Sequence, residues 1–421
     1  MSQISVSSEI GRLRAVAVHR PGREVDNMTP SLMHELLFDD ILFGNEARQE
    51  HDTFRGILEK VADQVLDVQD LLGQALESSE AKTYFCKRLA ALHKLSKSQA
   101  ENLLDLPPAD LAEAVIGGWL SEAPDHSDYE FVMPPVPNLL FMRDPMAVLG
   151  HGVSLSNMAT NARRTEPFIM DCIIRFHPQF RLDSPEKIWF DVLNPRMKGK
   201  PQGSYTIEGG DVLVISPDTV AVGISVRTTQ SAVTLLAERL RHASPFKTLL
   251  AVLMPHHRSV MHLDTIFTQI DSEHCLIFPP YLDPKHDEVL PVVRMDLAGP
   301  DIGVVLKPSL LEALADEGMP LKPIFSGGIS RLDQEREQWT DGANAFCLAP
   351  GVILTYGRNT KTAEELDRHG YTCVEAETVL AENINLLDGK KYNVMIRGNE
   401  LSRARGGPRC MTMPLIRDAV V

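Results

Sequence analysis

The sequence predicts an α/β fold that repeats one strand–turn–strand–helix unit and carries an inserted block of helices. The first observation is the unit itself, which recurs four times between residues 143 and 369. The second is that residues 71–120 contain only short helical patterns, between segments that alternate strand and helix. The third is length, because 421 residues exceed the size at which a single core usually stops growing.

The bulk composition is that of a soluble globular protein. Hydrophobic residues make up 43% of the chain and charged residues 24%, and the net charge of −15 argues against nonspecific nucleic-acid binding. The first residues lack the pattern of a secretory signal, and no apolar run approaches the roughly 20 residues that span a bilayer. The six cysteines are scattered without a CxxC pair, so we expect neither disulfides nor a zinc site, and a cytoplasmic protein.

The N-terminal part predicts a strand at 12–19, a helix at 45–62 and a second strand at 64–68. The block that follows reads as helices, placed at 75–95, 98–104 and 108–120. We therefore predict that residues 1–70 and 131–421 form the catalytic α/β unit. Residues 71–130 are predicted to form an inserted helical subdomain.

Each repeat begins with a polar residue and then forms two strands around a tight turn, followed by a helix. The strand pairs are 147–149 with 153–155, 212–215 with 220–222, 265–270 with 275–278, and 345–348 with 352–356. The starting residues are Asp144, Asp211, Asp264 and Asn344. In a radial arrangement these positions converge at one end of a shared axis. Each acid alone could equally be an ordinary cap of a turn.

The strongest local signal is the loop at residues 405–412, RGGPRCMT, which places Cys410 between two arginines. Positive charge nearby lowers the pKa of a thiol, and the thiolate is the nucleophile. The alternative is a buried structural cysteine. If Cys410 joins the ring of acids, the cluster is costly unless a cation lies between them, which points to a cationic substrate.

His262 lies two residues before Asp264, and on a strand both would point to one face. A histidine with a cysteine supplies a proton carrier and a nucleophile near neutral pH. The alternative is metal binding together with His256 and His257, but adjacent histidines do not give a zinc-ligand spacing. We predict no metal.

Four ordered motifs carry a resemblance to a known family. They are PNLLFMRD at 137–144, EGGDV at 208–212, MHLDT at 261–265 and RGGPRCM at 405–411, with further matches at 36–40, 335–339 and 351–359. These motifs resemble those of the guanidine-modifying enzymes (the pentein fold) and, among them, the bacterial arginine deiminases.

The resemblance implies a five-bladed α/β propeller of ββαβ units with an inserted helical subdomain. It implies hydrolysis of L-arginine to L-citrulline and ammonia, the first step of arginine catabolism by the deiminase pathway, without a cofactor. By motif, Cys410 is the nucleophile, His262 the general acid and base, and Asp144 and Asp264 hold the guanidinium with Glu208 beside them. The implied substrate-binding residues are Asn138, Phe141, Arg163, Arg227, Arg405 and Asp211.

Two departures from the family pattern stand out. Pro408 and Arg409 occupy loop positions where some relatives carry glycine and histidine, and Ile329 replaces a more usual asparagine. Alternatives to an arginine deiminase are an agmatine or dimethylarginine hydrolase, an amidinotransferase, and an inactive arginine-binding protein on this fold. The expected partner is the small molecule L-arginine, with no nucleic acid and no membrane, and a homo-oligomer is the default for an enzyme of this size.

Overall fold

The computed structural model describes residues 4–121, 129–194, 196, 198–201 and 203–420. Five of the six sheets in these residues share one pattern, in which a first strand runs antiparallel to a second and the second runs parallel to a third. A helix lies between the second and third strands in each case. The four repeats predicted from the sequence are therefore confirmed, and the chain termini form a fifth.

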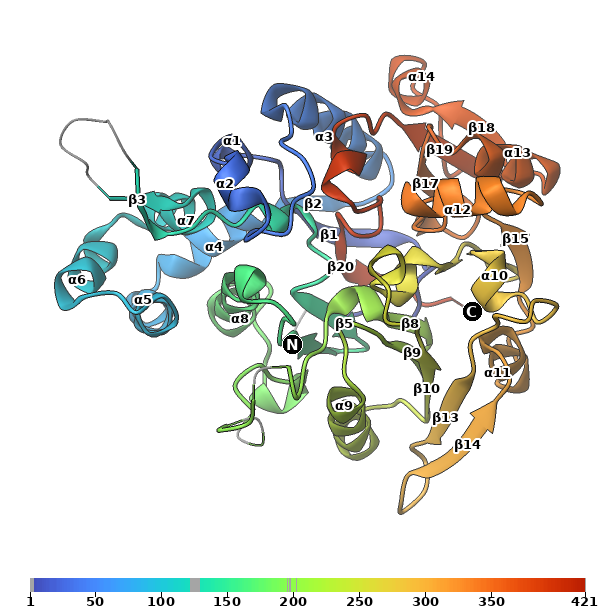
Figure 1. Ribbon diagram of the computed structural model, residues 1–421, viewed down its shortest axis with the longest axis horizontal. Helices are drawn as coiled ribbons and strands as arrows, with labels where there is room; N and C mark the ends of the chain where they lie inside the picture. The colour runs from blue at the N-terminus through green and yellow to red at the C-terminus, as the bar shows by residue number, and fades with distance from the viewer. Residues whose placement is uncertain (1–3, 122–128, 195, 197, 202, 421) are drawn as a thin grey trace.

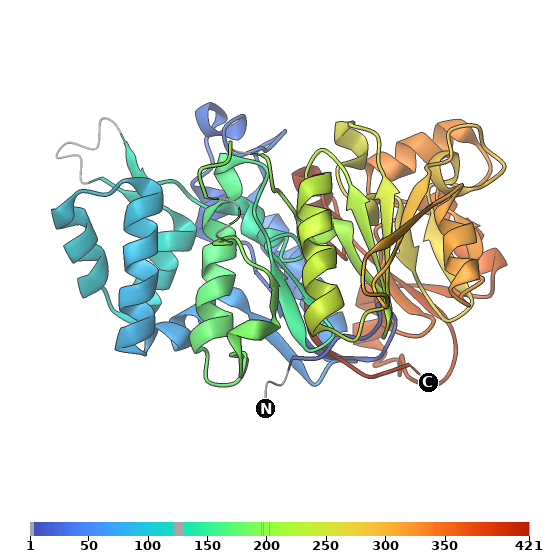
Figure 2. The same cartoon turned by 90° about the horizontal axis from the view of Figure 1, so that it is seen from below.

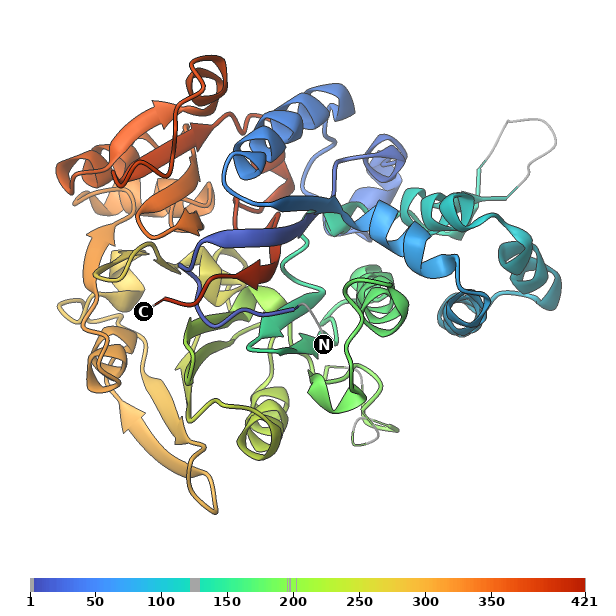
Figure 3. The ribbon, with the colours of Figure 1, turned by 180° about the vertical axis from the view of Figure 1, so that it is seen from behind.

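The sheet formed by the termini contains β20 (Met413–Arg417), β1 (Leu13–Val18) and β2 (Gln64–Asp67), with α3 (Gly44–Glu59) between β1 and β2. The short helices α1 (Arg23–Asp26) and α2 (Pro30–Met33) precede α3. Seen from behind, β1 and β20 lie side by side across the middle of the molecule (Figure 3). Pairing of the first and last strands closes the chain on itself.

The four internal sheets follow in chain order. The first contains β5 (Met146–Leu149), β6 (Gly152–Leu155), α8 (Thr165–Phe176) and β7 (Ile188–Phe190). The second contains β8 (Val212–Ser216), β9 (Thr219–Ile224), α9 (Gln230–Ala243) and β10 (Thr248–Leu253), extended by β13 (Val292–Asp296) and β14 (Gly303–Lys307).

The third contains β11 (Phe267–Gln269), β12 (His274–Ile277), α10 (Pro279–Leu282), α11 (Leu310–Asp316) and β15 (Lys322–Phe325), and α12 (Arg331–Trp339) follows it. The fourth contains β16 (Phe346–Ala349), β17 (Val352–Tyr356), α13 (Thr360–Arg368), β18 (Thr372–Glu375), α14 (Ala376–Ala381) and β19 (Tyr392–Ile396). The sheets are arranged around a common centre, with β5, β8 and β20 near the middle and α3, α8, α9, α11 and α13 toward the rim (Figure 1).

The helical block contains α4 (Val68–Leu76), α5 (Ser79–His93), α6 (Lys97–Asp105) and α7 (Pro108–Gly117). It forms one end of the molecule (Figure 2) and packs on α8 through a hydrophobic core that continues into the neighbouring sheets. Residues 122–128 of the predicted 71–130 subdomain lie outside the described residues.

Two helix predictions in this block were wrong in detail. The helix predicted at 75–95 is two helices, because the side chain of Ser78 caps a new start and accepts a hydrogen bond from the N–H of Ala81. The helix predicted to reach residue 120 ends at Gly117, since Gly118 has a φ of 89°. The next residues form β3 (Trp119–Leu120), which pairs with β4 (Phe131–Met133), so the block is not purely helical.

Candidate active site

A cavity of about 590 Å³ opens at the ends of the central strands. It is lined by residues from the loops that precede β5, β11 and β20, by Arg227 after β9, and by the N-terminal segment 30–39. The predicted site residues that line it are Asn138, Phe141, Asp144, Arg163, Arg227, His262, Arg405 and Cys410. Glu208, Asp211 and Asp264 are fully buried directly behind this wall. Residues predicted from four separate motifs therefore meet at one place.

Cys410 lies in a turn just before β20 and not on the strand itself. The side chain of Asn344 holds this turn, because its Oδ1 accepts hydrogen bonds from the N–H groups of Arg409 (3.1 Å) and Cys410 (3.2 Å). The Asn344 amide in turn donates to the carbonyl of Asp264 at 3.0 Å. Asn344 was predicted only as the start of the fourth repeat, and the structure adds that it fixes the cysteine loop.

The glycines of the loop allow a close approach. A Cβ on Gly407 would come within 2.6 Å of Asn344 Oδ1, and one on Gly406 within 2.2 Å of the Phe141 ring. A side chain at either position would therefore displace Cys410 from its anchor.

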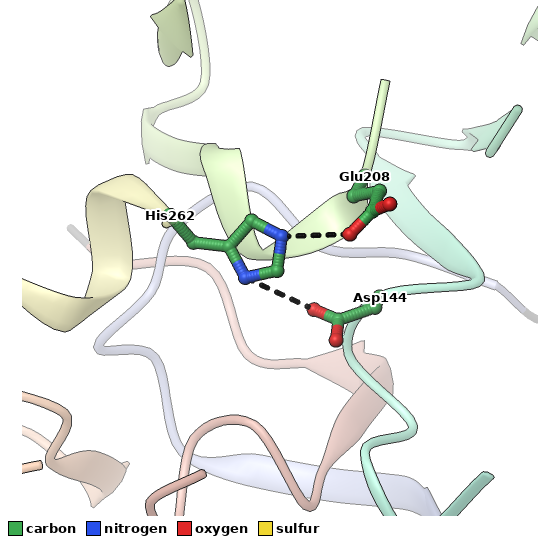
Figure 4. Close-up of side chains that lie close together, drawn as sticks. All are labelled: Asp144, Glu208 and His262. Carbon is green, nitrogen blue, oxygen red and sulfur yellow. Dashed lines mark hydrogen bonds and ion pairs between the residues drawn. The ribbon is translucent and has the colours of Figure 1, made fainter. Parts of the chain in front are cut away.

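His262 lies between two carboxylates (Figure 4). Its Nε2 is 2.9 Å from Glu208 Oε2, and its Nδ1 is 3.6 Å from Asp144 Oδ1. Burial opposes protonation, but Asp144 and the hydrogen bond to Glu208 outweigh it and raise the pKa of His262 to about 9. Burial also opposes ionisation of Glu208, yet Arg227 and His262 hold the pKa of that carboxyl well below its usual range. At neutral pH the pair is an imidazolium and a carboxylate, and the histidine is a proton donor.

The strand predicted at 265–270 begins later, at Phe267, and the segment that carries His262 and Asp264 is not a strand. His262 is extended, and Leu263–Thr265 forms a turn of 3₁₀ helix. The buried carboxylate of Asp211 accepts a hydrogen bond from the N–H of Leu263 at 2.9 Å, and it also accepts one from the hydroxyl of Ser225 at 2.7 Å. Asp211 thus stabilises the loop beneath the site, and its predicted substrate-binding role stays a prediction.

Asp264 reaches Cys410 from behind. Its Oδ2 is 3.8 Å from the cysteine Sγ, and its Oδ1 has no hydrogen-bond partner within the described part of the chain. Burial raises the pKa of the Cys410 thiol well above its usual value, and Asp264, Asp144 and Asp341 raise it further. Cys410 is therefore a thiol at neutral pH, and a cation beside the two nearer acids would favour its thiolate.

The three predicted arginines make different contacts. Arg163 pairs with Asp144 at 2.5 Å and grips Glu166 through two nitrogens at 2.7 and 2.8 Å. Arg227 pairs with Glu208 at 3.2 Å. These ion pairs hold the carboxylates of the site in place. The two arginines therefore have a structural role in addition to the substrate contacts that the resemblance implies.

Arg405 stacks over the ring of Trp339 with its guanidinium carbon 3.3 Å from the centroid. One of its terminal nitrogens is buried without a hydrogen-bond partner among the described residues. Asp341, also in the cavity wall, exerts the largest electrostatic attraction on Arg405. Neither Trp339 nor Asp341 was identified from the sequence as a site residue, since an aromatic or acidic side chain alone carries no such signal.

Arg409 forms a buried network of ion pairs behind the site, and the sequence did not predict this network. It is 1% exposed and binds Asp264 at 2.7 Å, while two nitrogens bind Glu9 at 3.1 Å each. Glu9 also accepts a hydrogen bond from the N–H of Val214. The sequence shows no sign of this contact, because Glu9 precedes the first strand and lies 400 residues away from Arg409 in the chain.

Asp144, Glu208 and His262 have ligand atoms close enough together to hold a metal ion. Each of these groups already has an oppositely charged partner, since Arg163 pairs with Asp144, Arg227 pairs with Glu208, and His262 faces both acids. The charges of these three residues are those of a protonated histidine between two carboxylates, so we do not assign a metal ion to this cluster.

Comparisons with known proteins agree with this geometry. The family model described as arginine deiminase matches residues 34–108 and 120–417. The chain belongs to the arginine deiminase family. It is similar to arginine deiminases of Limosilactobacillus fermentum, at 34% identity over 99% of both chains, and Bacillus cytotoxicus, at 33% identity over 98% of both chains.

Solved structures resemble the family fold at low identity. The N-terminal domain of ArgZ, an arginine dihydrolase from cyanobacteria bound to product, aligns at a TM-score of 0.50 with 14% identity, covering 96% of this chain and 97% of its own. SxtG, an amidinotransferase from Microseira wollei, aligns at a TM-score of 0.52 with 10% identity, and the alignment covers 99% of this chain and 98% of SxtG. These likenesses show that the chain shares its mixed α/β fold with both structures. Among the described residues no helix is long and apolar enough to cross a membrane.

Proposed function

We propose that this protein hydrolyses L-arginine to L-citrulline and ammonia. The observation that carries the proposal is one cavity whose wall presents a cysteine thiol, a protonated histidine and carboxylates, with arginines lining the same space. The carboxylates fit the planar, permanently charged guanidinium of arginine, and the arginines fit its α-carboxylate. The full-length similarity to arginine deiminases supports the same substrate.

The reaction proceeds in two steps through a covalent intermediate. The thiolate of Cys410 adds to the guanidinium carbon, and His262 gives its proton to the departing nitrogen, which leaves as ammonia. The product of this step is a thiouronium on Cys410. The neutral His262 then takes a proton from water, and the hydroxide adds to the same carbon. The carbon–sulfur bond breaks to give the thiolate and citrulline, and the proton left on the citrulline oxygen passes to the solvent, where it balances the protonation of ammonia.

The bound substrate itself activates the nucleophile. Without a ligand, the acids around Cys410 favour the thiol. A guanidinium between Asp144 and Asp264 offsets the negative charge of these acids and so lowers the pKa of the Cys410 thiol. Titration of thiolate absorbance with and without an unreactive arginine analogue tests this step. An unchanged pKa on binding the analogue would eliminate substrate activation.

The wider organisation is part of the same proposal. The five sheets with a common pattern, arranged around a centre, support a five-bladed propeller into which residues 71–130 are inserted as a helical subdomain. The six free cysteines support a reducing, cytoplasmic compartment. We propose that the protein needs no cofactor or metal and that it associates with copies of itself.

Citrulline and ammonia release from L-arginine, without an added amine, tests the reaction class. The wild type is expected to release both, which excludes an amidinotransferase or an inactive binding protein. Cys410→Ala is expected to lose at least about 10⁴-fold in kcat, because the nucleophile is removed. Equal activity in Cys410→Ala and wild type would overturn the covalent route. Agmatine or dimethylarginine as the preferred substrate would assign the chain to another branch.

A further inference from the structure

The cavity wall contains three acids among the described residues, namely Asp39, Asp144 and Asp341. Asp39 pairs with Arg258 at 2.7 Å, and Asp144 pairs with Arg163 at 2.5 Å. Asp341 has no such arginine bonded to it in the part of the chain that the structure describes, and its Oδ2 is buried without a hydrogen-bond partner. Its side chain belongs to a residue that is only 8% exposed. A buried acid without a partner is costly, and in a binding cavity it indicates a cationic group on the ligand.

The backbone holds Asp341 in a fixed position at the end of α12. Its N–H donates to the carbonyl of Gln338 at 3.1 Å, and its own carbonyl accepts from the N–H of Asn344 at 3.0 Å. Its φ is 63°, in the left-handed region that aspartate and asparagine tolerate better than most residues. Because Asn344 also holds the turn of Cys410, one loop sets the positions of the nucleophile and of this carboxylate.

Arg405 presents the opposite charge on the same cavity wall. Its guanidinium is held against the ring of Trp339, and its Nη1 is buried without a hydrogen-bond partner among the described residues. Asp341 attracts Arg405 electrostatically, but these two buried atoms do not bond to each other. A free acceptor and a free donor of opposite charge therefore line one cavity. An α-amino acid carries the complementary ammonium and carboxylate on a single carbon atom.

We propose, resting on the arginine hydrolysis proposed above, that Asp341 binds the α-ammonium group of the substrate while Arg405 binds its α-carboxylate. The guanidinium lies at the other end of the substrate, between the carboxylates beside Cys410. Asp341 is then a specificity-determining residue, because a guanidine without the amine leaves a buried carboxylate unpaired. The cavity therefore selects a free α-amino acid over guanidines whose amine is absent or acylated.

The contact between Asp341 and an ammonium group depends on pH. The charged and titratable groups that act on Asp341, or on which it acts, are Arg405, Asp264, Arg358, Cys410 and Tyr356. Burial, opposed by Arg405 and aided by Asp264, raises the pKa of Asp341 to about 7. The carboxylate is charged above this pKa and neutral below it, so the ammonium group should be bound more tightly at pH 8 than at pH 6.

Three guanidines separate the charged groups of the substrate. L-Arginine has both groups, agmatine keeps the amine without the carboxylate, and 5-guanidinopentanoate keeps the carboxylate without the amine. Asp341→Asn is expected to lower the affinity for L-arginine and for agmatine by about 10- to 100-fold, because the variant removes a charged partner of the amine. The affinity for 5-guanidinopentanoate should change by less than about twofold, because this ligand makes no such contact.

Calorimetric titration of Cys410→Ala protein, with and without Asp341→Asn, measures these affinities without turnover. Equal losses for all three ligands would overturn the assignment, because Asp341 would then act on the shared guanidinium. Losses for L-arginine and 5-guanidinopentanoate but not for agmatine would also overturn it, since Asp341 would then act through Arg405. Neither result affects the proposed hydrolysis, which depends on citrulline release by wild type. Absence of L-arginine binding would overturn both.

Asp283→Asn is the matched control, because Asp283 is 6% exposed, lies outside the cavity wall and accepts a hydrogen bond from the N–H of Lys285 at 3.2 Å. It should leave all three affinities unchanged. Asp341→Gly is a second variant that suits the positive φ, and it should reproduce the pattern of Asp341→Asn. If neither variant folds, the pH dependence decides. In Cys410→Ala protein, the affinity for L-arginine relative to 5-guanidinopentanoate should rise from pH 6 to pH 8, and a constant ratio would overturn the proposal.

Discussion

Two groups of arginines and carboxylates lie beside His262 and Cys410. One group faces the cavity, and the other is buried behind it. In front, Arg227 lines the cavity, with a side chain that is 15% exposed and one ionic partner, Glu208. Within the described part of the chain, its other terminal nitrogen contacts only the sulfur of Met261, at 3.8 Å. Behind, Arg409 is 1% exposed and bonds to Glu9, Asp264 and the carbonyl of Val212.

The difference separates a group that can bind substrate from one that can only hold the site in place. The front arginine keeps donors available to an anion in the cavity, whereas the donors of the back arginine are already in use. Asp264, Arg409 and Glu9 together carry one net negative charge, and two further buried arginines, Arg143 and Arg417, also act on Glu9. Beyond the effect of burial, Asp264 in this group raises the pKa of the Cys410 thiol, and we propose that it also holds the guanidinium.

The largest expected effect comes from breaking the back group. Arg409→Ala leaves Glu9 and Asp264 buried without their partner, which should cost about 3–5 kcal/mol of unfolding free energy. Arg227→Ala should cost less, because its side chain is partly exposed. Urea denaturation of both variants measures the contrast. A loss in Arg409→Ala no larger than that in Arg227→Ala would refute the distinction between the two groups.

The front group should also depend on pH in a range where the back group does not. The pKa of His262 is raised to about 9, so the stabilisation that its charge gains from the surrounding acids, Asp144 first and then Glu208, is complete below the unfolded value of about 6.5 and is lost as pH rises through about 9. These acids together should contribute on the order of 3 kcal/mol at pH 6, and Glu208 supplies a part of it. In the back group, burial opposes ionisation of Glu9, but Arg409 and Arg143 lower its pKa to about 2, so Glu9 does not titrate between these values.

The unfolding free energy of wild type and Glu208→Gln, compared from pH 6 to pH 9, measures this contribution. The difference between the two proteins should be largest at pH 6 and should shrink toward pH 9. Glu9→Gln is the matched control, and its difference from wild type should stay constant over the same range. A Glu208→Gln difference that does not change with pH would show that His262 is not held protonated by Glu208.

The next largest expected effect is that of Arg227→Ala on the binding of L-arginine. A hydrogen bond between charged groups contributes about 1.5–3 kcal/mol, so kcat/KM for L-arginine should fall by about 10- to 150-fold. Agmatine lacks the carboxylate, and its turnover should change far less. Steady-state kinetics on both substrates decides this assignment. Equal losses on the two substrates would mean that Arg227 acts through Glu208 and does not contact the carboxylate.

The front of the site was predictable from the sequence and the back was not. Asp144, His262 and Cys410 lie in motifs whose order and spacing can be recognised, and the repeats indicated that their loops converge. Glu9 carries no such pattern, because one acid in a loop before the first strand resembles many surface acids. Its contact arises from the pairing of β1 with β20, which brings the two ends of the chain together.

The sequence also failed to predict two places where a local turn interrupts an expected strand or helix. A strand was predicted to begin at residue 265, but the carboxylate of Asp211 binds the backbone N–H of Leu263, and Leu263–Thr265 forms a 3₁₀ turn. The strand therefore begins at Phe267. The break between α4 and α5 likewise depends on the cap that Ser78 provides. A side chain that bonds to the backbone can override the residue pattern, and in the first case the partner lies in another repeat.

Glu9→Gln gives the smallest expected effect and the most selective test of the back group. The amide keeps the shape of Glu9 but removes its charge, so Arg409 compensates Asp264 more fully. The pKa of the Cys410 thiol should fall, and KM for L-arginine should rise a few-fold as the pull on the guanidinium weakens.

Thiolate absorbance measured against pH, together with KM, tests the Glu9→Gln prediction. Glu50→Gln is the matched control, because Glu50 is also buried and accepts hydrogen bonds from backbone N–H groups at residues 399–401, away from the cavity. It should leave the pKa of Cys410 unchanged. A purely structural role for Glu9 would lower stability without moving the thiol pKa, whereas an electrostatic role moves the pKa in the direction given. The sign of that shift distinguishes an acid that tunes the nucleophile from one that only fills space behind it.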